Sequence, residues 1–133
     1  MAIQYSVAVN NARLDAVEST TGTAPKLRIF SGSQPANCAA ADSGTLLCEI
    51  TLPSDWMNAA VSASKTLLGA WSGTATGGAA ATPTHFRIWN SGATTCHIQG
   101  TAGIGSGDLQ VNGTITSGQT VSVSSFTLNA ANT

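Results

Sequence analysis

The sequence predicts an all-β protein: an antiparallel β-sandwich of jelly-roll type with seven to eight strands and a short N-terminal helix. Three observations favour this class. From residue 26 onward, short runs alternate apolar and polar residues with a period of two. Turn-rich pieces such as "NSGATT", "GIGSGD" and "TSGQ" separate these runs at intervals of about ten residues. A chain of 133 residues without a long linker fits a single domain, 1–133.

The first 22 residues are expected to form an arm followed by a helix at about residues 10–20. Asn10 or Asn11 can cap the start of this helix, because a side-chain oxygen can accept a hydrogen bond from a free backbone N–H. Gly22 lies just past its expected end. The domain therefore divides into an arm and helix at 1–22 and strands between 25 and 130.

The strands expected from the alternation are residues 26–30, 44–52, 65–71, 85–90, 95–101, 108–113 and 120–130. In the last strand, Val121 and Val123 share a face, whereas Phe126 has the opposite parity. A β-bulge near Ser124–Ser125 accounts for this change. The expected core includes Phe86, Ile88, Ile98, Val121, Val123 and Phe126. The small-residue segment Ser72–Thr84 predicts a loop between two strands.

The stretch "THFRIWNSGATTCHIQG" holds both histidines, one cysteine and one tryptophan, and is therefore the place to look for chemistry. It predicts a β-hairpin. Cys96 and His97 are neighbours on a strand, so their side chains point to opposite faces and cannot form a nucleophile–base pair. Residues expected to face the core are Phe86, Ile88, Cys96 and Ile98; the polar face, solvated or turned to a partner, holds His85, Arg87, His97 and Gln99.

A metal site is not predicted either. His85 can lie near His97 or Gln99 across the hairpin, but two imidazoles fall short of the ligands that zinc requires. No sequence spacing brings Asp55 or Asp108 to them. "GIGSGD" lacks the lysine and the following helix of a phosphate-binding loop. We therefore expect no catalytic residue, no cofactor and no metal, and a protein that is not an enzyme.

The composition limits the classes of partner that the chain is expected to bind. Charged residues make up 8% of the chain and the net charge is -1, so binding to nucleic acid or to a membrane surface is not expected. No apolar run is long enough to span a bilayer, and the first residues do not resemble a signal peptide. The three cysteines leave at least one free thiol; burial as small apolar residues is the simplest reading, and a Cys38–Cys48 disulfide stays open.

The surface must be built largely from Ser, Thr, Asn, Gln, Gly and Ala, with few lysines to protect strand edges. Such a neutral surface favours association with partners. The three tryptophans, Trp56, Trp71 and Trp89, are either core and interface anchors or a platform for stacking a sugar. These features indicate a structural component of an assembly.

Four segments carry a family resemblance: "MAIQYSVAVNNARLDAVESTTG", "PKLRIFSGSQPANCAAADSGTLLCEITLPSDWM", "THFRIWNSGATTCHIQGT" and "GQTVSVSSFTLNAAN". Together they cover nearly the whole chain, and "NARLDAVE" with "LPSDWM" is the most distinctive part. The sequence resembles a family of small virion proteins of tailed bacteriophages, similar to capsid cement or decoration proteins.

This resemblance implies a cement protein assembled in the host cytoplasm and placed on the capsid exterior of the virion. Its implied partners are the major capsid protein and further copies of itself; the alternative is a tail, neck or adhesion component that binds glycan. An extended arm can pair with a neighbour's strand, and a small-residue loop can follow a flat surface. The predicted interface residues are Met1, Ile3 and Tyr5 of the arm and Gly73, Thr76, Gly78 and Thr82 of the loop.

Overall fold

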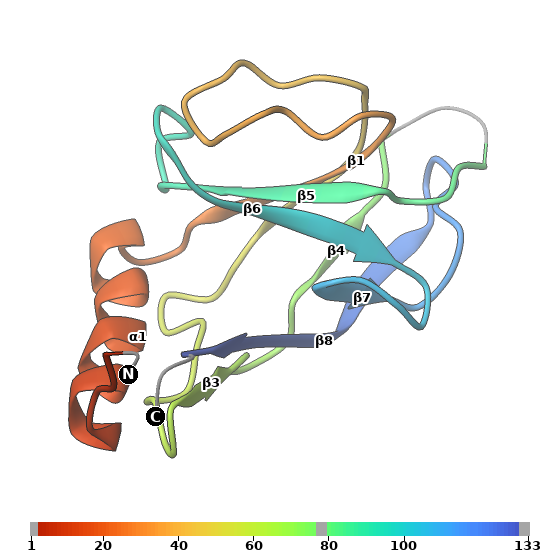
Figure 1. Ribbon diagram of the computed structural model, residues 1–133. Helices are drawn as coiled ribbons and strands as arrows, with labels where there is room; N and C mark the ends of the chain where they lie inside the picture. The colour runs from red at the N-terminus through yellow and green to blue at the C-terminus, as the bar shows by residue number, and fades with distance from the viewer. Residues whose placement is uncertain (1–2, 77–79, 131–133) are drawn as a thin grey trace.

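The computed structural model describes residues 3–76 and 80–130, and Figure 1 shows one helix beside a curled β-sheet. The elements are α1 (Val7–Thr21), β1 (Lys26–Ser31), β2 (Thr45–Thr51), β3 (Ser64–Thr66), β4 (Ser72–Thr74), β5 (His85–Trp89), β6 (Cys96–Gly103), β7 (Leu109–Val111) and β8 (Thr120–Asn129). The expected all-β class with a short N-terminal helix is confirmed.

Helix α1 begins earlier than the sequence predicted, because its cap is Ser6 and not Asn10 or Asn11. The Ser6 hydroxyl accepts a hydrogen bond from the backbone N–H of Val9 at 3.2 Å. Both asparagines lie inside the helix. The predicted end is confirmed, because Gly22 follows the last helical residue with a φ of 89°, a conformation that suits glycine.

The strands form a sheet in the order β2-β1-β5-β6-β7-β8-β3, with β4 paired to β8. Just after β4, Ala75 forms a β-bridge with Cys48 of β2, so the two ends of the curled sheet are joined. Strands distant in sequence thus lie side by side, β1 next to β5 and β3 next to β8 (Figure 1). Helix α1 packs at the β3 end of this sheet.

One strand pair departs from the antiparallel arrangement that we expected. Strands β6 and β7 run parallel, with Ala102 opposite Leu109. The connection between them turns back sharply through Gly105 and Gly107, whose φ angles are 71° and 91°. The Asp108 carboxylate then accepts hydrogen bonds from the backbone N–H and hydroxyl of Thr101, both at 3.0 Å. These contacts hold the turn closed. Because β6 and β7 are parallel and the other strand pairs are antiparallel, the sheet is mixed.

The region between residues 65 and 84 also differs from the prediction. The expected strand 65–71 is wrong in extent, because β3 ends at Thr66 and the chain leaves the sheet before Gly69, where φ is 75°. The expected loop 72–84 is wrong at its start, because residues 72–74 are strand β4. Farther along, Ala81 forms a bridge with Ile115. Strand β4 thus pairs with β8, whereas Ala81 pairs with the connection between β7 and β8.

The core lies inside the curled sheet, and the predicted core is largely confirmed. Phe86, Ile88, Val121, Val123 and Phe126 are buried, whereas Ile98 is partly buried against them. Four aromatic rings form a connected cluster: Trp56, Trp71, Phe126 and Phe86, with successive centroids 5.8, 5.3 and 5.5 Å apart. The predicted bulge is confirmed as well, since Val123 and Ser125 pair with successive residues of β7 and leave Ser124 unpaired.

Candidate functional site

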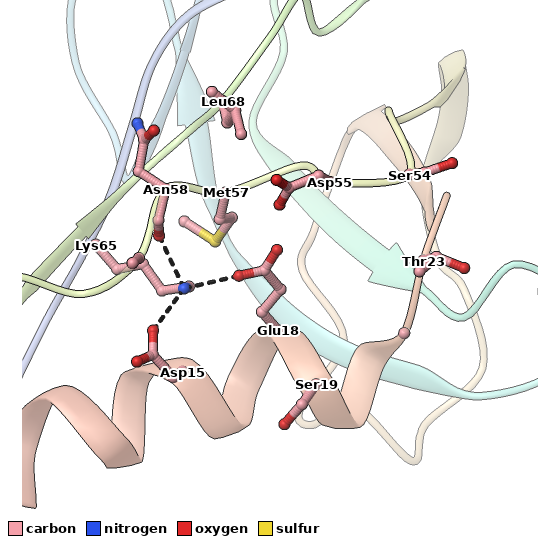
Figure 2. Close-up of a pocket in the computed structure, with 12 residues that line it drawn as sticks. Asp15, Glu18, Ser19, Thr23, Ser54, Asp55, Met57, Asn58, Lys65 and Leu68 are labelled. Atoms are coloured by element: carbon pink, nitrogen blue, oxygen red, sulfur yellow. Dashed lines mark hydrogen bonds and ion pairs between the residues drawn. The ribbon is translucent and has the colours of Figure 1, made fainter.

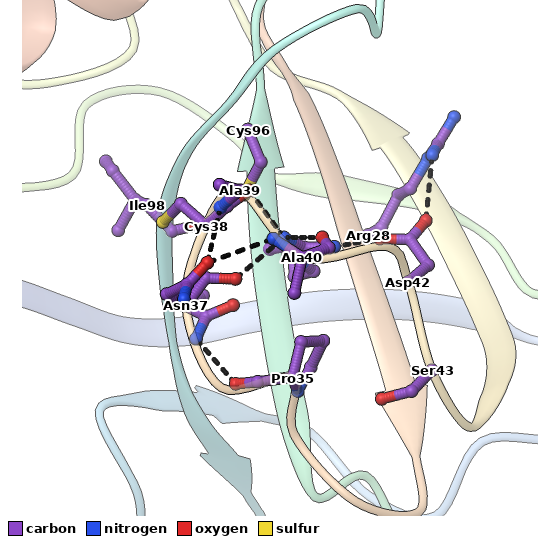
Figure 3. Close-up of polar contacts among 12 residues, drawn as sticks. Arg28, Pro35, Asn37, Cys38, Ala39, Ala40, Asp42, Ser43, Cys96 and Ile98 are labelled. Carbon is purple, nitrogen blue, oxygen red and sulfur yellow. Dashed lines mark hydrogen bonds and ion pairs between the residues drawn. The ribbon is translucent and has the colours of Figure 1, made fainter.

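The hairpin of β5 and β6 is confirmed, but its polar face is not solvated. A loop of residues 32–44, which we name the covering loop, lies over this face (Figure 3). Beneath it, His85 is 1% exposed and Arg87 is 0% exposed. The amide of Gln99 donates to the carbonyl of Pro35 at 2.8 Å. The expectation of a solvated or partner-facing strand was therefore wrong for these residues, because the covering loop shields them from solvent and supplies polar contacts to Arg87 and Gln99.

Arg87 is the centre of these contacts (Figure 3). Its Nη2 donates to the backbone carbonyls of Cys38 and Ala40, both at 2.8 Å, and its Nη1 donates to the carboxylate of Asp42. The guanidinium also lies 5.1 Å from the ring centroid of Trp89. A planar group with several donors suits this task, because it can bind a carboxylate and carbonyls at once. Arg87 therefore fixes the covering loop rather than acting on a ligand.

The two histidines are separated. His85 lies opposite Thr101, whereas His97 lies at the other end of the hairpin, in a bulge between the pairs Ile88–Ile98 and Trp89–Cys96. Of the two neighbours that we considered for His85, this pairing rules out His97, whereas Gln99 lies opposite Arg87, two residues along from the partner of His85. Burial lowers the pKa of His85, and its ring stacks on Phe30 with centroids 4.9 Å apart.

The same bulge changes the face of Cys96. Because Cys96 pairs with Trp89, its side chain shares the outer face with Arg87, and the predicted core orientation was wrong. Its Sγ donates to the carbonyl of Ile98 at 3.4 Å. Cys48 is buried in the core and donates to the carbonyl of Thr74, far from Cys38 in the covering loop. All three thiols are free, so the open alternative of a Cys38–Cys48 disulfide is not present.

The tryptophans do not form a sugar platform. Trp56 and Trp71 are 0% and 2% exposed in the core. Trp89 is half-buried, and the guanidiniums of Arg28 and Arg87 each lie 5.1 Å from its ring centroid. Within residues 3–76 and 80–130, no group of three or more His, Cys, Asp or Glu side chains is placed to hold a metal ion. No helix in the same ranges is long and apolar enough to cross a membrane.

A cavity of about 700 Å³ lies between α1 and the chain that leads into β3 (Figure 2). Lys65 is 2% exposed at its wall, and its ammonium contacts Asp15 at 2.8 Å, Glu18 at 2.7 Å and the carbonyl of Asn58 at 2.8 Å. Burial alone would lower the pKa of Lys65, but the hydrogen bonds to both carboxylates outweigh it and raise that pKa. The buried ammonium therefore has three polar partners. Because Asp15 and Glu18 belong to α1 and Lys65 to β3, this group links the helix to the sheet.

Acid is expected to weaken this junction. The hydrogen bond from Lys65 holds the pKa of Asp15 below its ordinary value, so the charged carboxylate stabilises the fold above about pH 4 and this stabilisation is lost as the pH falls below it. Between about pH 5 and about pH 3, the wild type should lose more thermal stability than the Asp15→Asn variant. The measurement is the unfolding midpoint temperature at both pH values; an equal loss in both proteins would contradict this account.

Five of the seven large apolar side chains that are exposed in the described residues lie on the arm, on the first turn of α1 and on the segment before β3. Ile3 is 75% exposed, Tyr5 40%, Val7 49%, Val9 44% and Val61 67%. We name these five residues the apolar end. Tyr5 and Ile3 were predicted from the sequence, whereas Val7, Val9 and Val61 were missed. The run "SVAVN" carried a signal for Val7 and Val9, but we placed the helix start after them.

Hydrogen bonds hold the parts of the apolar end together. The Asn11 side chain accepts from the backbone N–H of Ala63 at 2.9 Å, and Asp15 accepts from that of Ala60 at 3.0 Å. These bonds place Val61 beside the first half of α1. The guanidinium of Arg13 lies 5.0 Å from the ring centroid of Tyr5 and holds the arm against the helix. The apolar end is therefore a built surface and is the candidate partner-binding site.

The other predicted interface residues are scattered. Gly73 lies within β4, half-buried against Ile50, where a Cβ would come within 3.0 Å of that side chain. Thr76 and Thr82 are exposed. Met1 and Gly78 lie outside the described residues. In the described part of the segment 72–84, four threonines are exposed: Thr74, Thr76, Thr82 and Thr84. The expectation that this segment contacts a partner stays a prediction.

Comparison of the chain with models of protein families, with curated proteins and with solved structures found no match.

Proposed function

We propose that this chain is a non-enzymatic structural protein of a tailed-phage virion: a capsid cement protein that binds the outer face of the major-capsid lattice and stabilises the head. The resemblance in its sequence supports the virion role. The observation that carries a binding role is the apolar end, which holds five of the seven large apolar side chains exposed in the described residues. The other two, Leu46 and Ile104, are separate from it in sequence. Exposed apolar groups gathered in one place indicate a contact surface.

The apolar end suits binding by many copies. Burying one large apolar side chain contributes about 1.5–3 kcal/mol, so a few of them give a modest affinity for each copy. Residues 3–5 precede the helix and pair with no strand in the part of the chain that the structure describes. Such a segment can add to the edge of a neighbouring sheet through its backbone. When neighbouring copies also contact each other on a lattice, these modest contacts reinforce one another.

Removal of the arm tests this proposal. Deletion of residues 1–5 leaves Ser6 and its capping hydrogen bond in place, so the variant is expected to fold. Its affinity for heads stripped of the native protein should fall by a factor of about ten or more, because the apolar contacts of Ile3 and Tyr5 are lost. The measurement is co-sedimentation with stripped heads over a range of protein concentrations.

The matched control is Ile104→Asp, which changes an exposed apolar residue outside the apolar end and should bind like the wild type. Ile3→Asp should behave like the deletion. Undiminished binding by both arm variants would remove Ile3 and Tyr5 from the interface and contradict the proposed role of the arm. Binding of labelled wild-type protein to isolated tails, and not to heads, would instead assign the chain to the tail.

A further inference from the structure

Two of the three cysteines lie together on the outer face of the hairpin. Cys38 in the covering loop and Cys96 in β6 line the same cavity of about 500 Å³, with Trp89 and Thr95 among its other walls. The two side chains are close enough to influence each other, since Cys38 is among the groups that raise the pKa of Cys96. Figure 3 shows both side chains at one end of the covering loop. The bulge at His97 is what turns Cys96 toward this face.

The backbone around Cys38 is held in place independently of its thiol. Its carbonyl accepts from Arg87 at 2.8 Å, and the neighbouring Asn37 side chain accepts from the backbone N–H of Ala39 at 2.9 Å. Cys96 is held by the ladder between β5 and β6. Both thiols are therefore positioned before any bond forms, which favours reaction with each other over reaction with a third group.

We propose that Cys38 and Cys96 form a disulfide when the protein meets a disulfide oxidant, and that this bond fastens the covering loop to β6. In the reduced protein that loop is held to the hairpin by polar contacts to Arg87 and Gln99. A covalent link adds to them by restricting the unfolded chain between the two cysteines. The Cys96 thiol donates to the carbonyl of Ile98 at 3.4 Å in the reduced protein and gives up this contact when the disulfide forms.

The chemistry balances as thiol–disulfide exchange. The half-buried Cys38, as its thiolate, attacks one sulfur of glutathione disulfide and releases one glutathione thiolate, which takes up the proton. Cys96 then loses its proton and displaces the second glutathione from Cys38. The two protein thiols are oxidised and the oxidant is reduced to two glutathione molecules. Burial raises the pKa of Cys96 to about 11, with Arg87 opposing and Cys38 adding to this rise, so the more exposed Cys38 reacts first.

The timing of this reaction rests on the proposed function. A virion protein is made in a reducing cytoplasm, where the thiols stay free, and meets oxidising surroundings after release. The disulfide would then stabilise the protein on the released particle. The chemical test below uses the purified chain without heads, so its failure and the failure of the cement proposal are distinguishable.

The experiment treats the folded, reduced full chain with glutathione disulfide and counts thiols after denaturation. The count should fall from three to one, with no added mass from glutathione and no dimer. Cleavage on the N-terminal side of aspartate separates Cys38 from Cys48 at Asp42, so mass mapping can identify the linked pair. Hydrogen exchange of the covering loop should slow in the oxidised protein.

Three variants make the result specific. Cys48→Ser should lose both of its remaining thiols, as the wild type does. Cys96→Ser should stop at a glutathione adduct on Cys38, and Cys38→Ser should form no internal disulfide. A link between Cys38 and Cys48, a disulfide-linked dimer, or three unchanged thiols in the wild type would each overturn the proposal.

Discussion

Replacing Arg87 with methionine is expected to lower the free energy of unfolding by about 3–5 kcal/mol. The guanidinium is fully buried, and it serves the Asp42 carboxylate and the carbonyls of Cys38 and Ala40. Methionine fills a similar volume but donates no hydrogen bond. The carboxylate then loses its buried partner, and the carbonyls must either stay unpaired or draw the covering loop away from the sheet.

Arg28→Met is the matched control. Arg28 also pairs with Asp42, at 3.1 Å, but its side chain is 22% exposed and water can replace its contacts. Its loss should cost about 1 kcal/mol or less. Urea unfolding of both variants, followed by tryptophan fluorescence, gives the comparison. Equal losses in the two variants would mean that the covering loop does not enclose Arg87 in solution.

Local patterns were sufficient for the fold class and for much of the core. Alternation with a period of two depends only on neighbouring residues, and it placed Phe86, Ile88 and Phe126 correctly inside. The change of parity after Val123 located the bulge at Ser124. The hairpin was recognisable from its turn. These features are encoded within about ten residues of chain, which is why the sequence reveals them.

Features that depend on distant residues were missed. The sequence around Lys65 reads as one long strand, but β3 and β4 contact different parts of β8, and Trp71 must enter the core between them. The parallel pairing of β6 and β7 depends on a turn whose direction its glycines permit but do not specify. Tertiary packing decides such cases, not the propensity of the segment itself.

The outer face of the hairpin was misread for a related reason. An alternation that places His85 and Arg87 on one face normally indicates a solvated face. The covering loop gives little hint that it folds over them, because Asp42, a partner for arginine, is its only charged residue. The bulge at His97 then reversed Cys96, because one extra residue changes the face of everything beyond it. The candidate interface was found in part, since the sequence pointed to Ile3 and Tyr5 but not to Val61.

Phe86→Ala is expected to destabilise the protein by about 3–5 kcal/mol, because it leaves a cavity at the centre of the curled sheet. The ring is 1% exposed and meets Phe126 edge-on, with centroids 5.5 Å apart. It also lies over Gly100, where an added Cβ would come within 2.9 Å of the ring. The space at Gly100 is therefore already filled by Phe86, and the neighbouring strand cannot close the gap without moving.

Phe86→Leu is the graded control, because it keeps most of the apolar volume and should cost about 1.5 kcal/mol or less. Urea unfolding of both variants measures the difference, with an unchanged dependence on urea concentration showing that the same fold is being compared. If Phe86→Ala costs no more than Phe86→Leu, the ring does not pack between Gly100 and Phe126, and the register of β5 against β6 is wrong. That register also sets the positions of Arg87 and Cys96, so this result bears on the covering loop and the proposed disulfide as well.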